Sequence, residues 1–147
     1  MPAPKIVKSK LGEQHFSVGA IIQKNNKILI IERNLPPKGF AGMAGHIDEN
    51  EAPEQALARE IKEETNLNLL SKKLLFKKRI IQKEDCVSKS KIHRWYLYKC
   101  AVSGEIKPAK KEVKSIRFMT RKQIKKLYKE KRLEYAWVII FKKLKII

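Results

Sequence analysis

The sequence predicts an α+β domain in which a mixed β-sheet lies between helices. The first observation is the order of patterns along the chain, which runs strand pair, helix, strands and helices. The second is the spacing of apolar residues, which is typical of strands in some segments and of helices in others. The third is the length of 147 residues, which suits one hydrophobic core. We therefore expect a single domain over residues 1–147.

The N-terminal part of the chain predicts a β-hairpin. Residues 1–14 are polar and contain two prolines, so we expect an arm there. Strands are predicted at residues 16–23 and 27–32, and the asparagines between them favour a tight turn because Asn tolerates positive φ. Residues 33–45 contain two prolines and three glycines and predict a loop. Glycines in such a loop let the backbone approach a ligand or a metal closely.

A helix is predicted over residues 51–65. Asn50 is a suitable N-cap, and Pro53 fits the first turn. One side of this helix carries apolar residues at helical spacing, which we expect to pack on the sheet: Ala56, Leu57 and Ile61.

The remaining elements complete the sheet and its second helical layer. Strands are expected at residues 69–82, broken or bent, at 92–102 and at 113–119, with a polar loop at 83–91 and a basic loop at 108–112. Thr120 and Gln123 form a capping-box pattern that begins a helix to about residue 129. Apolar residues at helical spacing predict a last helix at 134–145.

The predicted helix at 51–65 concentrates acidic residues on a basic protein. Glu60, Glu63 and Glu64 lie at i, i+3 and i+4, so a helix places them on one face. Like charges at these spacings cost about 0.2–0.5 kcal/mol per pair, and the helix dipole disfavours anions near the C-terminus. A hard divalent cation with oxygen ligands would offset this repulsion, and Mg²⁺ binds through a few carboxylates and substrate phosphates.

The same residues carry a resemblance to a known family. Gly45 is followed by five residues and Glu51, and then by seven residues and the run Arg59-Glu60-Ile61-Lys62-Glu63-Glu64. This spacing resembles the signature of the Nudix hydrolases across residues 45–67, with Asn66 in place of the last glycine. Asn is the next most suitable residue for a left-handed helix end. The resemblance implies an α/β/α sandwich and a divalent-metal-dependent pyrophosphohydrolase that cleaves a nucleoside diphosphate linked to another group.

The resemblance also implies roles for particular residues. The expected metal is Mg²⁺, with Mn²⁺ as the alternative, and the implied ligands are the Gly45 carbonyl and three carboxylates: Glu60, Glu63 and Glu64. Arg59 is expected to orient a carboxylate, and Glu51 to act through water or as a salt-bridge partner. The general base is left open between Glu60 and Glu112, while Glu105 and Glu84 are weaker alternatives.

Other side chains carry weaker signals. His46 stands where the family often has glycine, and it either contacts a phosphate or caps the turn. Aromatic residues on the 92–102 strand either stack on a nucleobase or belong to the core. Three cationic residues are phosphate-binding candidates by position alone: Arg33, Lys38 and Arg94. Neither Cys86 nor Cys100 has a neighbouring base in the sequence, so we expect free thiols and no cysteine nucleophile.

Substrate and partners follow only in part from the sequence. Markers typical of ADP-ribose, diadenosine polyphosphate, coenzyme A and NADH hydrolases are missing, which leaves a nucleoside triphosphate or a nucleotide sugar as the default substrate. The net charge of +19 also suits removal of pyrophosphate from the 5′ end of RNA, although lysine scattered along the chain favours a compositional origin. A further alternative is a catalytically inactive module that binds nucleotide or RNA. We expect a cytoplasmic protein without membrane association, and the family resemblance suggests a homodimer.

Overall fold

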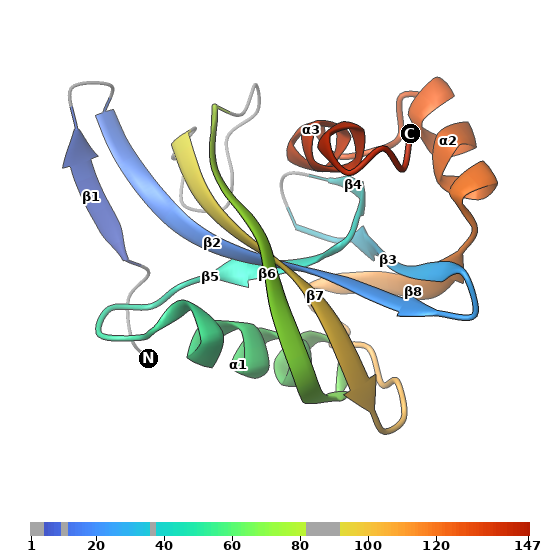
Figure 1. Cartoon of the computed structure of the whole chain (residues 1–147), viewed down its shortest axis with the longest axis horizontal. Coiled ribbons are helices and arrows are strands. Elements are labelled where there is room, and N and C mark those ends of the chain that lie inside the picture. The colour runs from blue at the N-terminus through green and yellow to red at the C-terminus, as the bar shows by residue number, and fades with distance from the viewer. Residues whose placement is uncertain (1–4, 10–11, 36–37, 82–91) are drawn as a thin grey trace.

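The computed structural model describes residues 5–9, 12–35, 38–81 and 92–147. Within these residues the chain forms eight strands and three helices. Figure 1 shows how they are arranged. The strands are β1 Ile6–Ser9, β2 Gly12–Lys24, β3 Lys27–Arg33, β4 Gly39–Ala41, β5 Met43–His46, β6 Asn68–Ile81, β7 Ile92–Ser103 and β8 Val113–Met119. The helices are α1 Pro53–Thr65, α2 Arg121–Lys129 and α3 Tyr135–Lys143.

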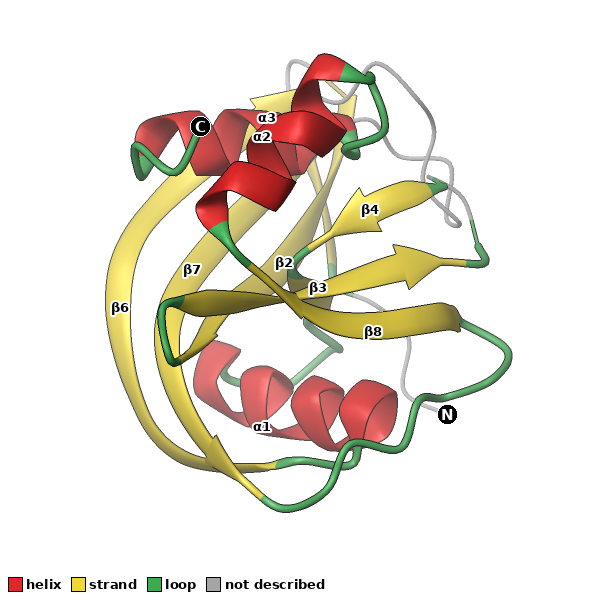
Figure 2. Cartoon of the chain, turned by 90° about the vertical axis from the view of Figure 1, so that its right-hand side faces the viewer, coloured by secondary structure: helices red, strands yellow, loops and turns green. Residues whose placement is uncertain are grey.

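The strands form a mixed sheet. Its main order is β4-β3-β2-β7-β6, while β1 and β5 also pair with β2, and β8 pairs with β3. The β2–β7 pairing is parallel, and the other pairings are antiparallel. The long strand β2 therefore joins the two halves of the sheet (Figure 2).

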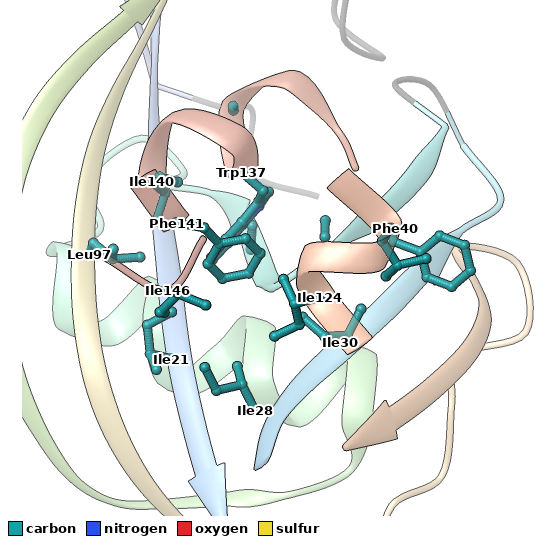
Figure 3. Close-up of a cluster of buried hydrophobic side chains, with 14 of the residues drawn as sticks. Ile21, Ile28, Ile30, Phe40, Leu97, Ile124, Trp137, Ile140, Phe141 and Ile146 are labelled. Carbon is teal, nitrogen blue, oxygen red and sulfur yellow. The ribbon is translucent and has the colours of Figure 1, made fainter. Parts of the chain in front are cut away.

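Two hydrophobic clusters cover opposite faces of the sheet. Because side chains alternate along a strand, Ile28 and Ile30 of β3 join the cluster beneath α2 and α3, whereas Leu29 and Ile31 join the cluster beneath α1. Figure 3 shows the first cluster, in which Trp137 and other side chains of α3 meet the sheet. The α+β sandwich expected from the sequence is confirmed.

Several local predictions agree with the structure. Asn25 and Asn26 have φ of 50° and 64° and connect β2 to β3 as a two-residue hairpin turn. The Thr120 hydroxyl accepts a hydrogen bond from the Gln123 backbone N–H at 3.2 Å, which confirms the capping box. The predicted bend in the 69–82 strand corresponds to two register shifts in β6, at Leu69/Ser71 and Leu74/Phe76.

Two predictions of irregular structure were wrong. The arm predicted at residues 1–14 contains β1 and the start of β2, which pair with each other. The loop predicted at residues 33–45 contains β4 and β5, which pair with β3 and β2. In both segments the strand conformation depends on partners distant in sequence, and local composition does not reveal such pairing.

The start of α1 also differs from the prediction. The helix begins at Pro53 and its N-cap is Ala52, not Asn50, which adopts a left-handed φ of 62° in the preceding turn. The Gln55 side chain accepts a hydrogen bond from the Ala52 backbone N–H at 2.9 Å and so satisfies one group at the helix start. At the other end Asn66 has φ of 68°, as its left-handed role requires.

The lysines of β6 have a structural explanation. β6 lies at an edge of the main strand order and exposes most of its side chains, including Lys72, Lys73, Lys77 and Lys78. Charged side chains on an edge strand oppose pairing with other chains. These lysines contribute to the net charge of +19 and protect the sheet edge against pairing with other chains. Among the described residues, no helix has the length and apolar character needed to span a bilayer.

Candidate active site

Arg59 is the centre of the charged network on α1. Its Nε and Nη2 atoms donate to the two carboxylate oxygens of Glu51 at 2.8 and 2.9 Å. Its Nη1 atom donates to Glu60 at 2.8 Å and to Glu63 at 3.2 Å, and Nη2 also reaches the backbone carbonyl of His46 at 2.9 Å. The planar guanidinium suits this fan of acceptors because it presents donors in fixed directions. One arginine thus holds the helix and β5 together.

The turn before α1 is tied into the same network. Asp48 lies 3.3 Å from Arg59 Nη2, and its backbone N–H donates to Glu51 at 3.0 Å. The hydrogen bonds from Arg59 hold the pKa of Glu51 below its ordinary value. Glu51 is therefore an ionised salt-bridge partner of Arg59, which is one of the two roles expected for it.

Gly45 and Glu60 fit against each other closely. A Cβ atom at position 45 would overlap the Glu60 carboxylate and its neighbouring methylene group, so only glycine fits there. Glu60 is 9% exposed, and this burial raises the pKa of its carboxyl group to about 7, against the opposing effect of Arg59. The absence of a side chain at Gly45 is what lets the carboxylate lie beside β5.

Glu64 lies one turn further along α1 and is 6% exposed. Burial raises its pKa well above the ordinary value, and the charge of Glu60 adds to this effect. The charge of Arg33 acts in the opposite direction. Glu63 differs from both, because 58% of its side chain is exposed, and it forms an ion pair with Arg59 one turn earlier on the helix. Of these three glutamates of α1, the two buried ones are therefore Glu60 and Glu64.

The loop between β7 and β8 is docked on the C-terminal end of α1 (Figure 2). The backbone N–H of Lys107 donates to the Thr65 carbonyl at 2.9 Å, and that of Ala109 donates to the Glu64 carbonyl at 3.2 Å. These bonds satisfy carbonyl groups that a helix end leaves free. Glu112 lies in this loop, is exposed, and raises the pKa of both Glu60 and Glu64 through its charge. The structure thus brings Glu112 to the buried carboxylates.

The donor set fits a hard divalent cation. Two buried carboxylates with raised pKa values are stabilised in their ionised forms by positive charge, and Mg²⁺ prefers such oxygen ligands. Gly45 lies directly against one of them, and Glu63 is on the neighbouring helical face. Arg33 is close enough to act on Glu64, and its buried Nε has no hydrogen-bond partner among the described residues.

Several other predicted residues lie elsewhere or are buried. Glu84 and Cys86 fall outside the described residues. Cys100 is a buried free cysteine whose pKa is raised to about 12 by burial, so it does not supply a thiolate. Arg94 donates to Gln14 at 2.6 Å, and Lys38 is exposed.

The aromatic residues of β7 belong to the core. Trp95 packs beneath α3, and Tyr98 packs beneath α1 with Tyr96 at its border. This agrees with the core interpretation, and it places Trp95 and Tyr96 on opposite faces of the sheet. Trp95 and Tyr98 are each 4% exposed, so neither side chain offers a surface on which a nucleobase could stack.

Sequence reasoning missed two features of the site. Asp48 joins the Arg59 network, and its position within the glycine-to-glutamate turn was the available signal. Among the described residues, one group of three metal-ligating side chains has all its ligand atoms within 4.8 Å, and it consists of His15, His46 and His93 rather than glutamates. No spacing rule joins these three positions, since they come from distant parts of the chain.

Two curated relatives are similar to parts of the chain. The ADP-ribose pyrophosphatase of Methanocaldococcus jannaschii is 51% identical over 61 residues, which is 40% of this chain and 36% of that protein. The 8-oxo-dGTP diphosphatase of Proteus vulgaris is 36% identical over 66 residues, which is 42% of this chain and 57% of that protein. The matches thus span about a third of the first relative's length and little more than half of the second's.

The fold and the whole-chain pattern agree with these partial matches. The structure is similar to that of the NUDIX domain of Shewanella oneidensis NrtR complexed with ADP ribose, with a TM-score of 0.71 and 16% identity over 90% of this chain and 86% of that one. The model of the NUDIX domain family matches residues 13–138. The chain therefore belongs to the Nudix hydrolase family.

Proposed function

We propose that the protein hydrolyses a pyrophosphate bond in a nucleoside diphosphate linked to another group, in a reaction that depends on a divalent cation. The observation that carries this proposal is the pair of buried carboxylates, Glu60 and Glu64, beside Gly45 and the Arg59 network. Buried acids with raised pKa values are typical of functional sites. Membership of the Nudix family supports the same reaction.

The residues of the site divide into cation ligands and positioning groups. Glu60, Glu63, Glu64 and the Gly45 carbonyl would hold Mg²⁺ or Mn²⁺. The chemistry that a bound divalent cation supplies is neutralisation of pyrophosphate charge and acidification of the attacking water. Arg59 is a positioning residue, because its bonds to Glu51 fix the guanidinium that orients the Glu60 carboxylate.

Proton transfer is assigned to a carboxylate near the cation ligands. As water attacks phosphorus and the bridging P–O bond breaks, a base must accept the water proton. In the metal-free protein burial raises the pKa of Glu60 to about 7, so this carboxyl group exchanges a proton near neutral pH before the cation binds. Glu112 acts electrostatically on the same carboxylates from the docked loop and is the second candidate. The base is one of these two residues.

The substrate class is proposed from the partial relatives. The names ADP-ribose pyrophosphatase and 8-oxo-dGTP diphosphatase correspond to the two default classes, a nucleoside diphosphate joined to a sugar and a nucleoside triphosphate. We include ADP-ribose although the sequence lacks the downstream proline typical of its hydrolases. Arg33 is proposed to contact a substrate phosphate through the Nε group that has no partner among the described residues.

Hydrolysis of a substrate panel tests this proposal. The panel contains ADP-ribose, nucleotide sugars, nucleoside triphosphates including 8-oxo-dGTP, dinucleoside polyphosphates and 5′-triphosphate RNA, with Mg²⁺ and then Mn²⁺, and products are identified by mass. We expect cleavage of a nucleotide, with at least about a 100-fold loss of activity in Glu64→Gln. Glu54→Gln is the matched control, because Glu54 is an exposed glutamate on the same helix.

Two outcomes would contradict the proposal. Equal activity in Glu64→Gln and wild type would remove the buried carboxylate from the reaction. A folded protein that binds nucleotides but cleaves none of the panel would favour the alternative of a catalytically inactive binding module.

Removal of pyrophosphate from the 5′ end of RNA is a second candidate, favoured by the net charge of +19. In that case RNA binding should weaken steeply as salt rises, because basic side chains release counterions from phosphates. A flat salt dependence would argue against it. The homodimer, the cytoplasmic location and the single domain over residues 1–147 stay predictions.

A further inference from the structure

All three histidines of this 147-residue chain gather at one place. They lie on three neighbouring strands, with His15 on β2, His46 on β5 and His93 on β7 (Figure 1). His15 is paired in register with His93, and Ser17, two residues further along β2, is paired with His46. Because residues two apart share a face of the sheet, the strand pairing brings the three imidazoles together.

The imidazoles have the separation that one metal ion requires. One ring nitrogen from each histidine lies within 4.8 Å of the other two, and His15 Nδ1 lies 3.4 Å from His46 Nε2. Zinc binds histidine nitrogen at about 2.0–2.1 Å in tetrahedral geometry, which places ligand nitrogens about 3.4 Å apart. One pair of nitrogens already has this spacing.

The surroundings of the cluster suit metal ligation. His15 and His93 are 0% and 2% exposed, while His46 is half-buried and leaves a route for an ion. His93 Nδ1 lies 3.2 Å from the hydroxyl of Ser17, which is also buried. Metal-bound histidines commonly use their second ring nitrogen in such a bond, which fixes the orientation of the ring.

The cluster is separate from the glutamate site. Gly45 faces Glu60 on the α1 side of the sheet, so the next residue, His46, faces the opposite side. There His93 lies near Trp95, which packs beneath α3. Imidazole ligands suit Zn²⁺ and other late transition metals, whereas Mg²⁺ selects oxygen ligands.

We propose that His15, His46 and His93 form a binding site for a transition-metal cation of the Zn²⁺ class, distinct from the carboxylate site. Three histidines leave one tetrahedral position open for water or another ligand. The site joins β2, β5 and β7, and it therefore fixes the strand that carries Gly45 and the His46 carbonyl bound by Arg59. Occupancy of the histidine site would stabilise the frame of the glutamate site.

Titration of the metal-stripped, tag-free chain tests this proposal. Zn²⁺ binding is measured by calorimetry in excess Mg²⁺, which occupies the oxygen ligands, and Co²⁺ is added separately as a spectroscopic probe. We expect one Zn²⁺ per chain and the strong visible absorption of tetrahedral Co²⁺. His46→Gln and His93→Gln should each weaken Zn²⁺ binding at least about 100-fold, since loss of a group that merely supports a ligand costs 10–100-fold. Glu64→Gln should bind Zn²⁺ as wild type does.

Each variant is checked for folding by its thermal transition without metal. Because His46 is half-buried, His46→Gln is expected to fold even where His93→Gln does not. Zn²⁺ should raise the melting temperature of wild type and Glu64→Gln, and not that of His46→Gln. Equal Zn²⁺ affinity in folded His46→Gln and wild type, absence of binding in wild type, or loss of binding only in Glu64→Gln would overturn the proposal.

Discussion

The two faces of β5 support opposite kinds of chemistry. On the α1 side, Gly45 makes room for a buried carboxylate, and Arg59 joins helix and strand through charged hydrogen bonds. On the other side, His46 meets two buried imidazoles beside Trp95. One residue of the strand thus borders a buried carboxylate on one face, and the next carries an imidazole on the other. A strand of only four residues can contribute to both sites because successive side chains of a strand point to opposite faces of the sheet.

The two faces differ in how their polar groups are stabilised. The imidazoles contact one another, and His93 lies beside the Ser17 hydroxyl. The α1 face instead buries two acids, and the charges of Arg59 and Arg33 offset only part of the effect of burial on their pKa values. The folded protein without metal is therefore under electrostatic strain on the α1 face. Perturbations of stability should reveal this difference.

The largest expected effect is on the pH dependence of folding in metal-stripped protein. The pKa of Glu60 rises from 4.5 to about 7 on folding, so between these values the unfolded chain releases a proton that the folded chain keeps. The Glu60 contribution to the free energy of unfolding should fall by roughly 3 kcal/mol as pH rises through this window. Urea unfolding from pH 4.5 to 7.5 measures it, and Mg²⁺ should flatten the curve.

The matched comparison is between Glu60→Gln and Glu54→Gln. Glu60→Gln should lose this part of the decline, because an amide does not titrate, whereas Glu54→Gln should keep it. An unchanged decline in Glu60→Gln would mean that Glu60 is ionised throughout and that the strain lies elsewhere.

Arg59→Lys should have the next largest effect. Lysine keeps the charge but lacks the planar guanidinium group, whose N–H groups bind both Glu51 oxygens, Glu60 and the His46 carbonyl. We expect a loss of about 2–3 kcal/mol in the free energy of unfolding, because partners are left without hydrogen bonds. Arg79→Lys on exposed β6 is the control and should change stability by less than about 0.5 kcal/mol. Equal effects of the two substitutions would show that the hydrogen bonds of the Arg59 guanidinium do not contribute to stability.

Gly45→Ala should cost about 2 kcal/mol by forcing its Cβ against Glu60. A double-mutant cycle with Glu60→Ala measures this contact directly. The alanine at position 45 should be much less costly when Glu60 is truncated, with an interaction energy above about 0.5 kcal/mol. Additive effects would mean that the cost of Gly45→Ala arises within the strand and not from the contact with the Glu60 side chain.

The contrast between the faces also explains what the sequence predicted. The α1 face is local, since Gly45, Glu51, Arg59 and the glutamates lie within 23 residues, and helix geometry alone places the acids together. The hairpin and the capping box were predicted for the same reason. The resemblance to the Nudix family drew on this local pattern and is confirmed.

The histidine face was not predictable in this way. His15 and His93 are 78 positions apart, and only the parallel β2–β7 register brings them together. His15 also lay between the predicted arm at residues 1–14 and the strand predicted at 16–23, so no element was assigned to it. The strands β4 and β5 were missed because their partners are equally remote. Docking of the 105–112 loop on α1 likewise depends on backbone contacts that no side-chain pattern encodes.

Glu112→Gln should have the smallest effect on stability and a large one on catalysis. The residue is exposed, so the free energy of unfolding should change by less than about 0.5 kcal/mol. If Glu112 accepts the water proton, kcat should fall by about 100-fold with little change in KM. Glu105→Gln, an exposed acid of the same loop, is the matched control and should retain full activity.

The pH–rate profile separates Glu112 from Glu60 as the base. In Glu112→Gln, loss of the base should remove the acidic limb of kcat while the Mg²⁺ requirement stays, because Glu60 and Glu64 still hold the cation. Retention of that limb, with kcat within about twofold of wild type, would exclude Glu112 and leave Glu60 as the base. Glu60 would then be both a cation ligand and the proton acceptor. Its pKa is about 7 in the metal-free protein, and this pKa would have to fall on cation binding because a ligand must be ionised. The Mg²⁺ dependence of the acidic limb in wild type measures that fall directly.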